Sequence, residues 1–243
     1  MQVGDTSFKA GRTIAVTTAP YFKPVIDGKH DDWKDAVPVT FATGGKKTAI
    51  STYWSQRSFA VLIAVEEDKL TPVPPTGGDA AALFDAVQIS MAPRDAKTPA
   101  QDDAQDQRYE FLLTGRSDGG GACFTLYQPE QKLATARQSR PLAGLETAGA
   151  QVAVRHNGGW TYYECSIPFK AMPLIQPEPG RDVCFSVLVH DPDGTGLRDW
   201  GQAAGLWPDQ RNRWAWCVWP GAKWPAEPPF DNKIEWGFCS SKQ

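Results

Sequence analysis

The sequence has no long hydrophobic run and no extended helical pattern. Its longest apolar stretches are far shorter than the roughly 20 residues that a membrane-spanning helix needs. Apolar residues do not recur at helical spacing over more than about two turns. Basic residues are not in excess either, because the formal net charge is −3. The sequence therefore predicts few or no helices, and neither a membrane nor a nucleic acid as a partner.

Cysteine is scarce, and its spacing is not that of a metal site. The five cysteines never occur as Cys-x-x-Cys, so a structural zinc site is not expected. Cys165 and Cys184 lie inside apolar strand patterns, and we predict that they are buried free thiols. A disulfide between Cys217 and Cys239 is the alternative for the C-terminal part, and the odd count leaves at least one thiol free in either case.

Glycine, proline and aromatic residues, in contrast, are abundant. The 22 Gly and 20 Pro follow no period and indicate many turns. Ten Trp and 11 Phe supply ample apolar surface for a core, which argues against disorder. A chain of 243 residues suits one large domain. We expect residues 1–18 to form an N-terminal arm and residues 19–243 to form a single domain.

Short apolar stretches bounded by turn residues predict about ten strands. Phe59–Val65 is apolar on both faces and should be a central strand of a hairpin. Val87, Ile89 and Met91 alternate with other residues and should face the core. Val183–Val189 is an apolar strand that ends in an acidic turn. This pattern is typical of an all-β protein, an antiparallel β-sandwich with two sheets of the jelly-roll or immunoglobulin-like kind.

The segment that follows the acidic turn is rich in tryptophan. Sugar rings have apolar faces that stack on tryptophan, and their hydroxyls need polar partners such as Asp, Gln and Arg. The stretch 198–216 offers both kinds of residue, which is the general composition of a small-molecule site. The alternative is that these tryptophans pack a loop against the sandwich.

The order of several short motifs resembles that of the family 9 carbohydrate-binding modules. These motifs are Val25-Ile26-Asp27-Gly28 with Asp32-Trp33, the hairpin from Trp54 to Asp68, Asp85-Ala86-Val87-Gln88-Ile89, Tyr109-Glu110-Phe111, Trp160 to Phe169, and Phe185-Ser186-Val187 with His190-Asp191. The resemblance covers about residues 20 to 200. It implies a β-sandwich, secretion, calcium-stabilised loops and sugar binding.

The sugar-binding residues of that family are only partly matched. Members place a tryptophan just before the third of these motifs, where this chain has Phe84. The acid expected on that strand is matched by Gln88, and the arginine expected on the next strand by Glu110. A second tryptophan is matched by Trp200 or Trp207. The resulting candidate ligand-binding residues are Trp200, Trp207, Trp214, Arg198, Arg211, Gln88 and Phe84.

The turn Asp191-Pro192-Asp193-Gly194-Thr195 is a candidate calcium site. Calcium prefers several oxygen ligands, and alternating acids around a glycine turn present them on one side. Asp191, Asp193 and Asp199 are the candidate ligands. The later glutamate of an EF-hand is missing, and an ordinary turn is the alternative. No organic cofactor is expected.

Two other functions remain open on the same scaffold. A polysaccharide lyase or glycoside hydrolase needs two acid–base groups on one face. Gln88, Glu110, Glu164 and His190 should point outward on successive strands, and Glu110 with His190 is the candidate catalytic pair. The alternative is that Glu110 and Glu164 are solvated strand residues. A haem-binding domain would use Met91 and His190 as axial ligands, but alternation favours Met91 as a core residue.

These observations leave the sugar, its linkage, the oligomeric state and a place within a larger enzyme undetermined. No signal peptide is visible at the first residues, so the location follows from the resemblance alone. The sequence predicts a glycan-binding domain that is secreted, periplasmic or on the cell surface. Its partner would be a polysaccharide or oligosaccharide, with binding favoured over catalysis.

Overall fold

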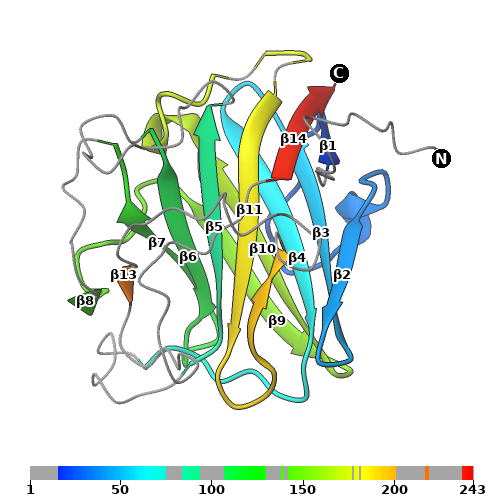
Figure 1. Ribbon diagram of the computed structural model, residues 1–243, viewed down its shortest axis with the longest axis vertical. Helices are drawn as coiled ribbons and strands as arrows, with labels where there is room; N and C mark the ends of the chain where they lie inside the picture. Colours follow the sequence, from blue (N-terminus) through cyan, green and yellow to red (C-terminus); the bar gives the residue numbers. More distant parts are fainter. Residues whose placement is uncertain are drawn as a thin grey trace, which may run out of the picture.

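Two β-sheets pack face to face in the computed structural model (Figure 1). It describes residues 16–74, 84–93, 107–129, 138–139, 142–176, 178–180, 182–200, 217–218 and 237–242. The larger sheet has the order β1 (Val16–Pro20), β14 (Gly237–Lys242), β11 (Asp182–Asp191), β5 (Ala86–Pro93), β6 (Tyr109–Gly115) and β7 (Gly121–Tyr127), and β12 (Gly196–Asp199) also pairs with β11. The smaller sheet has the order β2 (Val39–Thr43), β3 (Lys46–Trp54), β4 (Ser58–Glu66), β10 (Trp160–Pro168) and β9 (Gln151–Asn157).

The remaining elements are short. β8 (Gln138–Ser139) and β13 (Cys217–Val218) form a separate two-stranded sheet. The 3-10 helices η1 (Asp31–Trp33) and η2 (Phe169–Ala171) flank the smaller sheet's strands in sequence. No helix in the described part of the chain is long and apolar enough to cross a membrane. The predicted all-β sandwich, antiparallel within its main strands, is confirmed.

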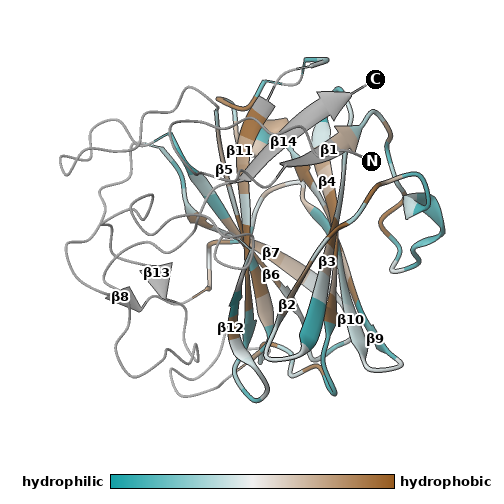
Figure 2. Ribbon diagram, turned by 45° about the vertical axis from the view of Figure 1, so that its right-hand side comes forward, coloured by the Kyte–Doolittle hydropathy of each residue, from teal (hydrophilic) through white to brown (hydrophobic). Residues whose placement is uncertain are grey.

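The inner faces of the two sheets share one hydrophobic core. Val87, Ile89 and Met91 of β5 are fully buried in it, as their alternation predicts. Val61 and Ile63 of β4 face them from the other sheet and are equally buried. Figure 2 shows the hydrophobic stretches of β4 and β11 in brown. Period-two alternation therefore fixes which side chains enter the core.

The outer faces of the central strands are covered as well. Leu62 of β4 packs outward with Trp33 and Tyr53 in a second apolar cluster, which explains why this strand is apolar on both faces. On the larger sheet, Phe124 packs with Phe84 in a third cluster. Polar side chains on these faces are thus removed from bulk water and need partners.

The ends of three strands meet at one end of the sandwich. β4 ends at Glu66, and β11 ends at Asp191 in a hairpin whose register pairs Asp191 with Gly196. The antiparallel register of β11 with β5 pairs His190 with Ala86, the first residue of β5. The residues just beyond these strand ends are therefore brought together from both sheets.

The cysteines partly match the prediction. Cys165 is fully buried and Cys184 is half-buried, and neither forms a disulfide. The side chains of Cys217 and Cys239 lie outside the described residues, so their disulfide stays a prediction.

Candidate functional site

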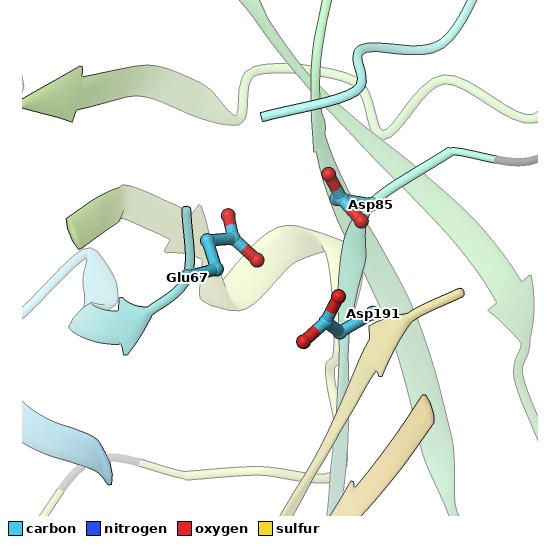
Figure 3. Close-up of side chains that lie close together, drawn as sticks. All are labelled: Glu67, Asp85 and Asp191. Carbon is cyan, nitrogen blue, oxygen red and sulfur yellow. The ribbon is translucent and has the colours of Figure 1, made fainter. Parts of the chain in front are cut away.

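Three carboxylates meet in the interior at this end of the sandwich (Figure 3). Glu67 directly follows β4, Asp85 directly precedes β5, and Asp191 is the last residue of β11. One oxygen atom from each carboxylate lies within 4.8 Å of the others. The exposed fractions of the three residues are 3%, 0% and 3%. Because they come from both sheets, this acid cluster (Glu67, Asp85 and Asp191) exists only in the folded protein.

The three carboxyl groups differ in their electrostatic surroundings. Burial raises the pKa of Glu67 to about 8 and that of Asp85 to about 7, and the neighbouring carboxylates act in the same direction. Burial also opposes ionisation of Asp191, but hydrogen bonds from Thr195 and Arg198 outweigh it and lower the pKa of Asp191. One member of the cluster is thus held ionised, while burial is the dominant effect on the other two and opposes their ionisation.

Several oxygen atoms of the cluster have no hydrogen-bond partner among the described residues. These are both carboxylate oxygens of Glu67 and the Oδ1 atom of Asp85, whereas Asp85 Oδ2 accepts a hydrogen bond from the Thr71 N–H at 2.5 Å. The hydroxyl of Tyr163 on β10 is also buried without such a partner. Burial raises the pKa of Tyr163, and the charges of Glu67, Asp85 and Asp191 act in the same direction. Unpaired buried oxygens are rare and need a physical explanation.

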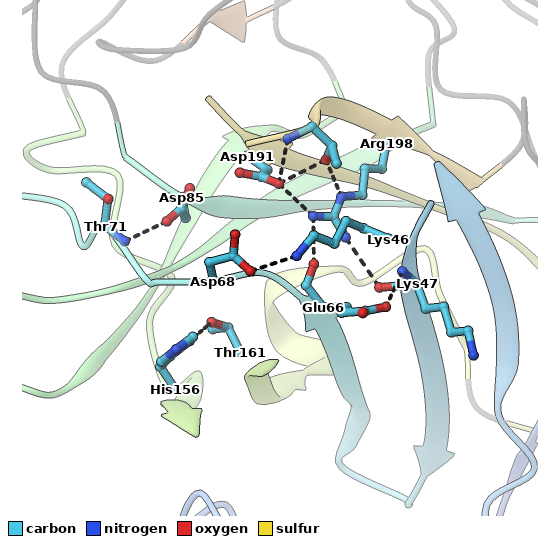
Figure 4. A network of polar contacts seen from close by, with 11 residues as sticks. Lys46, Lys47, Glu66, Asp68, Thr71, Asp85, His156, Thr161, Asp191 and Arg198 are labelled. Carbon is cyan, nitrogen blue, oxygen red and sulfur yellow. Dashed lines mark hydrogen bonds and ion pairs between the residues drawn. The ribbon is translucent and has the colours of Figure 1, made fainter. Parts of the chain in front are cut away.

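Arg198 closes one side of the cluster (Figure 4). Its guanidinium donates to Asp191 Oδ2 at 2.6 Å and to Thr195 Oγ1 at 2.6 Å. It also donates to the carbonyl oxygens of Glu66 at 2.9 Å and Lys47 at 3.3 Å, which belong to the other sheet. Arg198 is 0% exposed. The sequence suggests Arg198 as a ligand contact, but the structure gives it a role in joining the sheets, and its burial argues against contact with a ligand.

The other two predicted metal ligands lie differently. Asp193 is turned toward the surface, where its carboxylate pairs with Lys69 at 2.7 Å and accepts a hydrogen bond from the Thr71 hydroxyl at 3.1 Å. Asp199 is paired in register with Leu188, three positions from Asp191 along the hairpin, and its side chain lies outside the described residues. Of the predicted ligands, the structure places Asp191 in the acid cluster.

Sequence reasoning missed the other two members of the cluster. Glu67 lies in the acidic stretch that ends the β4 hairpin strand, and Asp85 opens the β5 pattern. An acid within two residues of an apolar strand was the available signal, because such a position lies at the edge of the core.

A second set of polar side chains lies on the outer face of β11, β5 and β6. Gln88 Nε2 donates to Glu110 Oε2 at 3.2 Å, and His190 Nε2 lies 3.3 Å from Gln88 Oε1. Since an amide oxygen only accepts, His190 Nε2 must carry a proton. Arg108 Nε lies 3.0 Å from Glu110 Oε1. We call Arg108, Glu110, Gln88 and His190 the polar row.

The polar row brings together three predicted residues but does not expose them. Gln88 lies between Glu110 and His190, and the exposed fractions of the three are 0%, 3% and 3%. Burial holds the pKa of His190 well below its usual value, so the ring is neutral at neutral pH. As it stands, the row is a hydrogen-bonded network that presents no acid–base pair to the surface.

Glu164 does not share this face. It lies on β10 in the other sheet, is 1% exposed, and accepts hydrogen bonds from the Gly28 N–H at 2.7 Å, the Asp27 N–H at 3.1 Å and Trp33 Nε1 at 2.8 Å. Its interpretation as a solvated strand residue is therefore wrong. Glu164 anchors the Asp-Gly turn and η1 to the smaller sheet.

The remaining candidate residues lie in the core or outside the described part. Trp200 is 1% exposed and packs on Phe185 with 5.7 Å between ring centroids, and Phe84 is 0% exposed. These positions argue against sugar stacking on either ring. Met91 faces the core while His190 faces outward, so the two cannot bind one haem iron from opposite sides. Trp207, Trp214 and Arg211 lie outside the described residues, and their role stays a prediction.

A cavity of about 310 Å³ lies at the turn between β6 and β7. Its polar wall contains Asp118 and the ion pair between Arg116 and Glu146. Its apolar wall contains Phe124 and Leu142, which belong to the same outer cluster as Phe84. Arg116 and Glu146 keep side-chain exposures of 40% and 62%, so their polar atoms are accessible.

Comparison with solved structures identifies the architecture. A family 9 carbohydrate-binding module from Caldicellulosiruptor kristjanssonii in complex with glucose aligns over 94% of this chain and 96% of its own, with 13% identity and a TM-score of 0.54. The chain has the fold of the family 9 carbohydrate-binding modules. The same module in complex with cellotriose aligns over 94% of each chain, with 13% identity and a TM-score of 0.55.

A third structure extends this likeness. A protein from Bacteroides uniformis with the provisional name carbohydrate-binding protein aligns over 95% of this chain and 100% of its own, with 10% identity and a TM-score of 0.53. No family profile and no curated protein matches the chain in sequence. The likeness to the family 9 fold is therefore one of backbone architecture, which the short motifs predicted correctly.

Proposed function

We propose that this protein binds a saccharide. The observation that supports the proposal most directly is the cavity at the β6–β7 turn, which combines an apolar wall with accessible charged groups. The fold adds support, because two structures that share it hold glucose and cellotriose. We further propose a secreted, periplasmic or cell-surface location and a role in polysaccharide recognition or degradation.

The walls of the cavity suit the two kinds of surface on a sugar. Phe124 and Leu142, which are 6% and 1% exposed, line the apolar wall and offer only a small carbon surface to the C–H face of a ring. Arg116 donates hydrogen bonds, and Asp118 and Glu146 accept them, as vicinal hydroxyls require. The volume of about 310 Å³ is at the lower end of the range for small-molecule pockets. One or two sugar rings, such as the end of a chain, fit this volume better than a long enclosed segment.

The test is binding of defined saccharides to cavity variants. Glucose, cellotriose and a panel of polysaccharides would be tested by isothermal calorimetry and by pull-down. Glu146→Gln and Arg116→Met should each weaken binding about tenfold or more, since each removes a charged hydrogen-bond partner. Lys170→Met removes an exposed charge elsewhere and should leave binding unchanged.

Two further outcomes distinguish a wrong location of the saccharide site from an absence of saccharide binding. Loss of binding in Trp207→Ala, with the cavity variants unaffected, would move the site to the tryptophan-rich segment and keep the function. Absence of binding by the wild-type protein to every saccharide tested would overturn the proposal.

A polysaccharide lyase or glycoside hydrolase is the second candidate function. The observation in its favour is that Glu110 and His190 lie on one face and are joined through Gln88. Product analysis of the pull-down samples decides between the two functions. Shortened or unsaturated oligosaccharides that disappear with Glu110→Gln would establish catalysis.

A further inference from the structure

We propose that Cys123 and Cys165 are the site of a disulfide bond that joins the two sheets. Cys123 lies on β7 of the larger sheet, and Cys165 lies on β10 of the smaller sheet. Neither forms a disulfide in the structure, which therefore shows the reduced form of the pair. The pair is distinct from Cys217 and Cys239, for which the sequence leaves a disulfide open. This inference does not rest on saccharide binding.

The two sheets approach each other closely beside this pair. Packed sheets lie about 10 Å apart, whereas a disulfide needs Cα atoms about 4.4–6.8 Å apart. Val152 of β9 is the register partner of Cys165. A Cβ atom built on Gly121, two residues before Cys123 on β7, would lie 2.6 Å from Val152 Cγ1 and 3.1 Å from the carbonyl carbon of Val152. The glycine thus lets the backbones of β7 and β9 approach, as a disulfide between the sheets requires.

Both thiols face the core that the sheets share. Cys123 and Cys165 belong to the same cluster of buried side chains, and their exposed fractions are 5% and 0%. Burial raises the pKa of the Cys165 thiol, and a side-chain hydrogen bond with Cys123 acts in the same direction. The two sulfur atoms are therefore neighbours, although they come from opposite sheets.

Oxidation would not leave the polar contact of Cys123 unsatisfied. The Cys123 thiol donates a hydrogen bond to Thr147 Oγ1 at 3.3 Å, and this bond would be lost with the thiol proton. The Thr147 hydroxyl also lies 2.9 Å from Thr125 Oγ1, so it keeps a hydrogen-bond partner. The disulfide itself would lie among apolar side chains, where sulfur packs as a hydrophobic atom.

The oxidant we assign is another disulfide, either of a small molecule or of a thiol oxidoreductase. The Cys123 thiolate attacks one sulfur of this oxidant and releases the first of its two thiolates. The Cys165 thiolate then attacks the Cys123 sulfur of the mixed disulfide and releases the second thiolate. The two cysteine protons pass to these thiolates, so the oxidant leaves as two thiols. Cys123 reacts first because it is the less buried of the two.

Burial determines when the pair can react. The thiolate is the reactive form of cysteine, and the raised pKa keeps Cys165 protonated in the folded protein. The folded, reduced protein should therefore resist both thiol reagents and disulfide oxidants. We expect the bond to form during folding, before the core closes around the two sulfur atoms.

The first experiment is refolding of the fully reduced chain in a buffer of oxidised and reduced glutathione, with a reducing buffer as the reference. Mass spectrometry of unreduced peptides should show the peptide that contains Cys123 linked to the peptide that contains Cys165. The oxidised protein should have a Tm about 8–16 °C above that of the reduced protein, because the bond closes a loop of roughly 40 residues in the unfolded chain.

Variants assign this Tm difference to the pair. Cys123→Ser keeps a hydroxyl that can donate to Thr147, and it should melt at the same temperature in both buffers. Cys165→Ala should likewise abolish the linked peptide and the Tm difference. Cys184→Ser is the matched control, because this half-buried cysteine lies on β11, and it should keep both. The double variant Cys217→Ser/Cys239→Ser should also keep both.

Three results would overturn the proposal. One is the absence of the linked peptide from the refolded protein and also from protein exported into the oxidising periplasm of a bacterial host, which would make both cysteines core thiols. The second is a linked protein that melts at or below the reduced protein, which would mean that the sheets are too far apart for an unstrained bond. The third is a Tm difference that persists in Cys165→Ala, which would assign it to another pair.

Discussion

Replacing Arg198 with methionine tests whether this residue joins the sheets or contacts a ligand. The guanidinium is fully buried and donates to groups from both sheets. Methionine keeps much of the apolar stem but leaves Asp191 buried without its cation. We therefore expect a large loss of stability with no direct effect on saccharide binding below the unfolding temperature.

The expected size follows from the buried ion pair. Removing one partner of such a pair costs about 3–5 kcal/mol. For a domain of this length, each kcal/mol lowers the Tm by about 2–4 °C, so the Tm should fall by about 6–20 °C. Arg198→Lys should lose less, because it keeps the charge but cannot reach every acceptor at once.

The assay of stability is differential scanning calorimetry. Saccharide titrations are made at about 20–25 °C, a temperature below the thermal unfolding midpoint of the variant. Arg57→Met, which alters an exposed arginine in the β3–β4 turn, is the matched control and should change the Tm by less than about 2 °C. An Arg198→Met protein with the wild-type Tm and no saccharide binding would refute the reasoning and restore Arg198 as a ligand contact.

Three further predictions concern buried groups. Glu164→Gln should lower the free energy of unfolding by about 1–3 kcal/mol in urea titrations. The reason is that the amide presents N–H groups to the N–H donors of Trp33 and the Asp-Gly turn. An unchanged free energy of unfolding would contradict these hydrogen bonds. Burial lowers the pKa of His190 below its unfolded value of about 6.5. The contribution of the neutral ring to the free energy of unfolding should therefore be fully present above that pH and be lost on acidification, by at most about 1.4 kcal/mol per pH unit. His190→Gln should remove this slope, and an equal slope in the variant would assign it to another group. Trp200→Ala should cost about 3–5 kcal/mol because the ring packs on Phe185, with unchanged saccharide affinity in the folded state; weaker saccharide binding would show that the ring contacts the ligand.

The sequence is informative where local alternation decides the structure. Val87, Ile89 and Met91 face the core as predicted, because a strand's side chains change face at every residue. The apolar character of Phe59–Val65 on both faces likewise marks a strand covered on both sides. These patterns, with the order of the short motifs, are sufficient to predict the sandwich.

Contacts between distant segments are not predictable in this way. Trp33 and Glu164 are 131 residues apart in sequence, and nothing local to either indicates their hydrogen bond. The acid cluster likewise joins three segments from two sheets. In sequence, Arg198 lies in a stretch with the composition of a ligand site. Only the fold reveals that its guanidinium donates to backbone carbonyls of the opposite sheet.

The pairing of β1 with β14 has a consequence for how the protein folds during synthesis. β1 forms a parallel ladder in which Val16 pairs with Phe238 and Pro20 with Lys242, and β14 separates it from β11. A ribosome adds residues from the N-terminus at about 5–20 per second, so β1 emerges first but must wait for the last strand. Until then, the edge of β11 that β14 will cover is available to other chains. The completion of this sheet edge should therefore be a late event with a high contact order, and the period before it is when the nascent chain is most prone to aggregate.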